Sequence, residues 1–121
     1  MRIVLLPAAK ATADVLIQTH FQGTGWLMGH HLGSFILISE IVPLSMQGRD
    51  SSRTRRAVRE KYREKFVGVF FADHPVSPSD DFLESVIMEI STGKIHFSLY
   101  QIDSGSGGKI FRPLKTERKQ T

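Results

Sequence analysis

The sequence predicts an α+β domain built around a mostly antiparallel, mixed sheet that is flanked by two main helices. Three observations predict this fold class. Residues 66–71 form a nearly continuous apolar run, which is typical of a buried strand. Apolar and polar residues alternate from Lys94 to Asp103, which indicates a half-buried strand. Between Ala8 and His20 the apolar residues recur at helical spacing, which indicates a helix.

The N-terminal half is expected to contribute one helix and the first three strands. Arg2–Leu6 is short and apolar, and it ends before Pro7, a residue well suited to the first position of a helix. A strand that leads into the helix Ala8–His20 is therefore predicted. Two further strands are predicted over Trp26–His31 and Ser34–Leu44, because the glycine-containing segment between them favours a hairpin.

The C-terminal half is expected to repeat the order strand, helix, strand, strand. After the buried strand, the polar cluster Ser77–Asp81 is a helix-start signal, and a second helix is predicted over Ser79–Glu89. The half-buried strand Lys94–Asp103 is followed by a glycine-rich turn at 104–108. A returning strand is then predicted over Lys109–Leu114.

Residues 1–116 are expected to form a single domain, because a chain of 121 residues buries one core. Within it, residues 45–65 are an expected basic insertion, since Arg49–Lys65 carries eight Lys or Arg against three acidic residues. The tail 117–121 is expected to fray. A basic run of this kind attracts nucleic acid. Few aromatic side chains accompany it for base stacking, so nucleic acid is not the favoured partner.

Three segments resemble the JAMM (JAB/MPN) domain, the fold of zinc-dependent isopeptidases and of their inactive relatives. Gly25–Gly29, with the sequence Gly-Trp-Leu-Met-Gly, is similar to the strand that follows the first helix of that family. Ile38–Leu44 resembles the next strand with its exit proline, and Gly68–Pro75 resembles the strand that ends in His-Ser-His-Pro. The resemblance implies a prokaryotic-type JAMM/MPN domain with a cytidine-deaminase-like architecture.

The resemblance also implies a zinc site that has degenerated. In the family, two His and one Asp hold zinc, a Glu acts as general base and a Ser stabilises the oxyanion. The first His position falls on Ala72 and the general-base position on Gln22, and neither side chain can perform that role. His74 and Asp80 match the other two ligand positions as remnants, and Ser77 matches the oxyanion serine.

Two alternatives for the site remain open. If the alignment is anchored on Pro78–Ser79, Phe82 occupies the position of the aspartate ligand. A rearranged zinc site could instead use one histidine of the pair 30–31, together with His74 and one aspartate of the pair 80–81.

We therefore predict a catalytically inactive JAMM/MPN-like domain that works as a protein-interaction or scaffolding module and needs no cofactor. The alternative is a divergent zinc isopeptidase or peptidase with ligands rearranged around His74. A protein partner or a second copy of the chain is expected, and Trp26, Phe35 and Phe111 are either apolar edges that it covers or side chains packed in the core.

A membrane partner is not expected, because no apolar run approaches the ~20 residues that span a bilayer. The apolar start of the chain is interrupted by Pro7 and soon followed by Lys10, so we expect a cytoplasmic protein. The chain has no cysteine, which excludes disulfides and thiolate metal sites.

Overall fold

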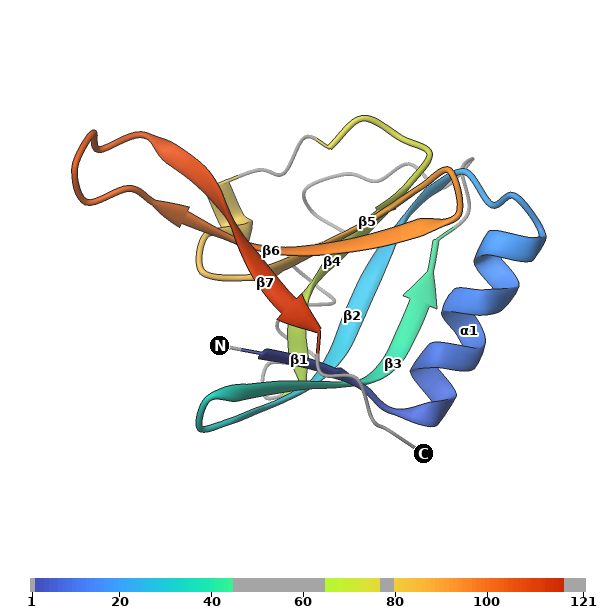
Figure 1. The fold of residues 1–121 in the computed structure, drawn as a ribbon. Coiled ribbons are helices and arrows are strands. Elements are labelled where there is room, and N and C mark those ends of the chain that lie inside the picture. The colour runs from blue at the N-terminus through green and yellow to red at the C-terminus, as the bar shows by residue number, and fades with distance from the viewer. Residues whose placement is uncertain (1, 45–64, 77–79, 117–121) are drawn as a thin grey trace.

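The structure, a computed structural model, describes residues 2–44, 65–76 and 80–116. Within these ranges, seven strands close into a barrel in the order β1-β3-β2-β4-β5-β6-β7 (Figure 1). The elements along the chain are β1 (Arg2–Leu5), α1 (Pro7–Gln18), β2 (Gly23–Leu32), β3 (Phe35–Pro43), β4 (Phe66–Ala72), the 3-10 helix η1 (Asp80–Phe82), β5 (Val86–Ser91), β6 (Lys94–Ile102) and β7 (Lys109–Thr116). The predicted insertion 45–65, apart from Lys65, and the tail 117–121 lie outside the described residues.

The predicted fold class, an α+β sheet flanked by two main helices, is wrong, because the helix expected over 79–89 does not form. The end of that segment belongs to strand β5, which pairs in parallel with β4 and antiparallel with β6. Val86, Ile87 and Met88 are consecutive and all buried, as a strand between two apolar layers requires. The two-helix JAMM/MPN architecture is thus replaced by a barrel, with α1 as the one α-helix of the described residues.

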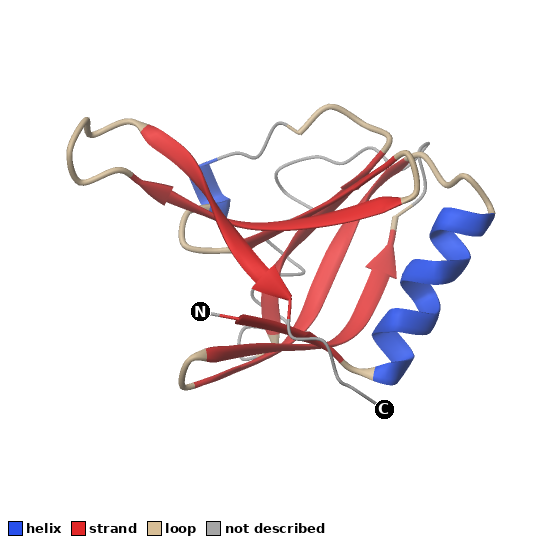
Figure 2. Cartoon of the chain, in the orientation of Figure 1, coloured by secondary structure: helices blue, strands red, loops and turns tan. Residues whose placement is uncertain are grey.

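One face of β4 packs into a core that it shares with α1. Phe70 lies in this core together with the helix residues Ala9, Ala13 and Leu16. Pro7 occupies the first turn of α1, where its missing N–H costs no intrahelical hydrogen bond. Figure 2 shows α1 alongside the barrel wall. The small alanine side chains on its inner face let the helix approach the strands closely.

The other face of β4 packs into an aromatic cluster. Val69 and Phe71 lie there with Trp26 of β2 and Phe82 of η1. The Trp26 ring centroid is 5.6 Å from that of Phe66 and 6.0 Å from that of Phe82. Of the two alternatives for Trp26, an exposed apolar edge and core packing, the structure shows core packing, since the residue is only 2% exposed. The barrel wall is therefore covered on both sides at β4.

The barrel closes through β1, a strand of four residues that runs parallel to both β3 and β7. Its contact with β7 consists of two residue pairs, between Arg2–Ile3 and Lys115–Thr116. β7 pairs with β6 only as far as Leu114, which lies opposite Phe97. Beyond Leu114, β7 thus leaves β6 and continues along β1.

Replacing Ala13 by Leu tests the packing of α1 on the barrel. Ala13 is 0% exposed, so a larger side chain has no room and should lower the free energy of unfolding by about 1–3 kcal/mol. The control is Ala11→Leu on the exposed face of the same helix, which should change it by less than about 0.5 kcal/mol. Urea unfolding followed by the fluorescence of Trp26, the single tryptophan, measures both. Equal stabilities of the two variants would contradict this packing.

Candidate functional site

One end of the barrel carries three of the predicted zinc-site positions. Gly23 at the start of β2 pairs with Ala72 at the end of β4, so Gln22 and the residues that follow Ala72 meet at this end. Ala72 is 0% exposed and its methyl group lies in the core shared with α1. Gln22 is exposed. The position of the first histidine ligand is therefore part of the hydrophobic core.

His74 is held as a turn residue. β4 ends at Ala72, and Asp73 then takes a φ of 44°, in the left-handed region, so the chain leaves the strand direction. The exposed ring of His74 stacks on Phe71, with centroids 6.2 Å apart and planes at 27°. Its Nδ1 lies 3.1 Å from the carbonyl oxygen of Pro75 and donates to it in the tautomer that carries the proton on Nδ1.

Asp80 forms an ion pair with a lysine and does not lie beside another of the predicted zinc ligands. Its Oδ1 accepts a hydrogen bond from Nζ of Lys109, and the two side chains form an ion pair between η1 and β7. The hydrogen bond that the exposed Lys109 ammonium group donates to this carboxylate is the main cause that raises the pKa of Lys109. Ser77 lies outside the described residues.

The histidine pair 30–31 lies near the other end of β2. His30 is seven residues beyond Gly23, which corresponds to roughly 23 Å along a strand. The rearranged set with His74 is therefore not brought together. In the described part of the chain, no group of three or more His, Asp or Glu side chains could hold a metal ion. These residues do not fit the zinc site that the JAMM resemblance implies.

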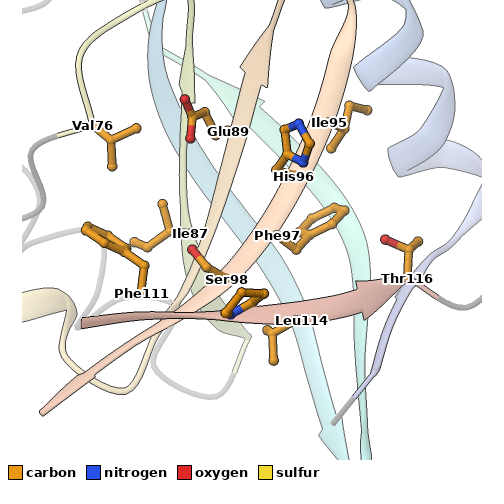
Figure 3. A pocket seen from close by; sticks show the side chains of 11 residues that line it. Val76, Ile87, Glu89, Ile95, His96, Phe97, Ser98, Phe111, Leu114 and Thr116 are labelled. Atoms are coloured by element: carbon orange, nitrogen blue, oxygen red, sulfur yellow. The ribbon is translucent and has the colours of Figure 1, made fainter. Parts of the chain in front are cut away.

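A pocket of about 640 Å³ opens elsewhere, on the face formed by β5, β6 and β7 (Figure 3). Its floor is formed by residues that lie side by side on the three strands, since Ile87 lies opposite Ser98 and Ser98 lies opposite Pro113. Most of its lining side chains are apolar. The lining residues are Val76, Ile87, Glu89, Ile95, His96, Phe97, Ser98, Phe111, Pro113, Leu114 and Thr116.

The pocket forms where β6 and β7 separate. Lys94–His96 pair with β5, but on their other side they have no strand partner within the described ranges. The pocket touches four consecutive residues of β6, Ile95–Ser98. Successive residues of a strand point to opposite faces, so a cavity that touches four in a row reaches around the strand edge. Pro113, which has no N–H for a ladder, stands on β7 just before the separation.

Among the described residues, Glu89 supplies the only carboxylate of the pocket lining. It lies opposite His96 in the β5–β6 ladder, and Figure 3 shows both side chains at the same end of the pocket. Its side chain is exposed and forms no ion pair or hydrogen bond with the residues that the structure describes. The pocket thus combines an apolar floor with one carboxylate that no described residue neutralises.

The sequence analysis did not identify this pocket. The alternation of 94–103 places His96 and Ser98 on the polar face of their strand, where they resemble ordinary surface residues. Phe111 is the signal that could have found it, since an exposed apolar edge was one alternative for both Phe35 and Phe111. Of the two alternatives for these residues, an exposed edge and core packing, the structure shows the exposed edge, since they are 37% and 45% exposed. The basic run Arg49–Lys65, apart from Lys65, falls outside the described residues.

Comparisons with known proteins show the fold only. No protein-family model matches the chain, and no curated protein matches it significantly in sequence. Solved structures do match. One is the solution structure of protein DSY2949 from Desulfitobacterium hafniense, a Northeast Structural Genomics Consortium target. It is 14% identical with a TM-score of 0.58, over 97% of this chain and 94% of that chain.

No helix among the described residues has the length and apolar character needed to cross a membrane.

Zinc content tests the assignment of the predicted metal site. Because Ala72 and Gln22 replace a ligand and the base, the purified untagged protein should contain zinc only at background level in elemental analysis. His74→Ala should leave that level unchanged. About one equivalent of zinc that is lost in His74→Ala would contradict the geometry described above.

Proposed function

We propose that this chain is a protein-interaction module that binds an extended segment of a partner protein in the pocket between β6 and β7. The observation that carries the proposal is a pocket with mostly apolar lining residues, bordered by a stretch of strand, Lys94–His96, that has no strand partner on one side among the described residues. The free N–H and C=O groups of a strand edge pair readily with an added strand, and adjoining pockets receive its side chains. The cavity volume of about 640 Å³ lies in the usual range for binding sites, roughly 300–1,000 Å³.

Phe111 supports the proposal because it presents apolar surface in a fixed orientation. Its ring stacks on Tyr100, with centroids 5.1 Å apart and planes at 27°, while 45% of the residue stays exposed. Ile102, near the end of β6, is 52% exposed. The β6–β7 hairpin that carries both residues projects from the barrel (Figure 1). An aromatic side chain that is ordered before binding loses little conformational entropy when a partner covers it.

The proposed role is binding rather than catalysis. The features that support binding are the unpaired stretch of β6 and the mostly apolar residues beside it, as far as the described residues show. A protein partner, with the chain located in the cytoplasm, stays our prediction.

Phe111→Ser tests the pocket directly. A library of random linear peptides is selected against the folded protein, and the affinity of the selected peptides is measured by fluorescence anisotropy. Loss of the aromatic wall should weaken binding roughly tenfold or more, as expected for an anchor residue. The control is Phe35→Ser, the same change at an exposed phenylalanine on β3, which should leave the affinity unchanged.

Two results would contradict the proposal. One is a failure to select any peptide against the folded protein. The other is selection of peptides whose affinity is the same for Phe111→Ser and for the unchanged protein.

A further inference from the structure

We infer that the pocket takes a basic, extended partner segment, one that adds as a strand to the free edge of β6 and places a lysine or arginine against Glu89. This inference rests on the function proposed above and names the chemistry of the partner.

The strand registers fix where the added strand would lie. β7 follows β6 from Ile102 to Phe97 and then turns away to pair with β1. A partner strand would take the place of β7 beside Lys94–His96, in the part of the barrel wall where no described strand forms a second neighbour of β6. The pocket lies directly beside this edge, since it touches Ile95 and His96.

The position of Glu89 favours a partner residue with a long side chain. A partner residue opposite His96 would stand in the same cross-strand row as Glu89, with His96 between them. Neighbouring strands are about 4.8 Å apart, so the backbone of the partner would lie roughly 10 Å from that of β5. Lys and Arg carry their charge at the end of long apolar stems, which can cross His96 and cover the apolar floor on the way.

The charge of Glu89 selects a cation. Within the described residues, no other carboxylate lines the pocket and Glu89 has no ion pair. Lys94 stands on the same face of β6, two residues before His96, but it does not line the pocket and does not pair with Glu89. A partner cation would therefore meet an uncompensated carboxylate at the end of an apolar surface, where opposite charges select the partner and fix its register.

The experiment selects peptides from the same random library against the unchanged protein and against Glu89→Lys. Peptides selected by the unchanged protein should be enriched in Lys or Arg beside a bulky apolar residue. Glu89→Lys should bind them about tenfold more weakly and should itself select Asp or Glu at the corresponding position. Glu89→Gln, which removes the charge without reversing it, should give an intermediate affinity.

Glu40→Lys is the matched control. Glu40 is an exposed glutamate on β3, away from the pocket lining, so this variant makes the same change of net charge without altering the site. It should bind the basic peptides with unchanged affinity. Trp26 fluorescence checks that each variant is folded before its affinity is measured.

Backbone methylation tests strand addition separately from charge. In an added strand, alternate N–H groups point toward the host edge and the others point away. N-methylation of one alternating set of residues in a selected peptide should abolish binding, and methylation of the other set should preserve it.

The outcomes separate this inference from the function on which it rests. Peptides that need Phe111 but show no preference for basic residues, or no reversal with Glu89→Lys, would overturn the inference and leave the interaction module standing. Equal effects of both methylation patterns would overturn the strand addition. Peptides that bind independently of Phe111 would contradict the proposed function, and the inference with it.

Discussion

A strand that is apolar on both faces must be covered twice, and β4 (Phe66–Ala72) imposes this requirement on the rest of the chain. On one side α1 supplies the cover through small side chains. On the other side Trp26 and Phe82 supply it through aromatic contacts. Each buried Val or Phe of β4 contributes about 1.5–3 kcal/mol relative to exposure, so neither cover can be removed without a large cost.

The packing of β4 on both of its faces also explains why the helix predicted over 79–89 does not form. Val86, Ile87, Met88 and Ile90 extend the two apolar layers by one strand, and β5 pairs in parallel with β4 from Gly68 to Ala72. Gly68 lets the two backbones approach, because a Cβ at this position would collide with the carbonyl oxygen of Val86. The aromatic side of the wall is then closed by η1, whose Phe82 reaches the Trp26 ring.

The pocket is a consequence of how the barrel closes. β1 has only four residues. β7 pairs with β6 as far as Leu114, and its next two residues pair with β1 instead. Within the described part of the chain, the edge of β6 at Lys94–His96 is therefore left without a partner strand. A free edge beside apolar side chains favours unwanted association unless it has a use, and proteins commonly protect such edges. Here the pocket makes the same edge suitable for a specific extended partner.

The sequence predicted most strands and the first helix close to their observed bounds, because these elements carry clear local signals. The alternation of 94–103 predicted β6 (Lys94–Ile102), and Pro7 with the following helical spacing predicted α1 (Pro7–Gln18). The prediction of a second helix over 79–89 was wrong because Phe82, Val86 and Ile87 match helical spacing in a short window. Their burial on both faces depends on β4, which local sequence does not reveal.

The pocket could not be predicted for a related reason. Its existence depends on the change of neighbour by β7, a long-range pairing that leaves only weak local signals in Pro113 and the exposed Phe111. Glu89 fell within the predicted helix, so its position opposite His96 could not be foreseen. The predicted site residues Ala72 and His74 were placed correctly at the end of a buried strand, but the histidine pair 30–31 lies near the other end of β2.

The most direct test of this account is an NMR titration of a selected peptide into the isotope-labelled protein. The account predicts that the largest amide shifts fall on Lys94–Ser98 and Leu114–Thr116, with intermolecular contacts between the backbones of the peptide and β6. Shifts concentrated on the β2–β3 hairpin around Leu32 and Phe35, the other exposed apolar residues at a hairpin, would contradict it.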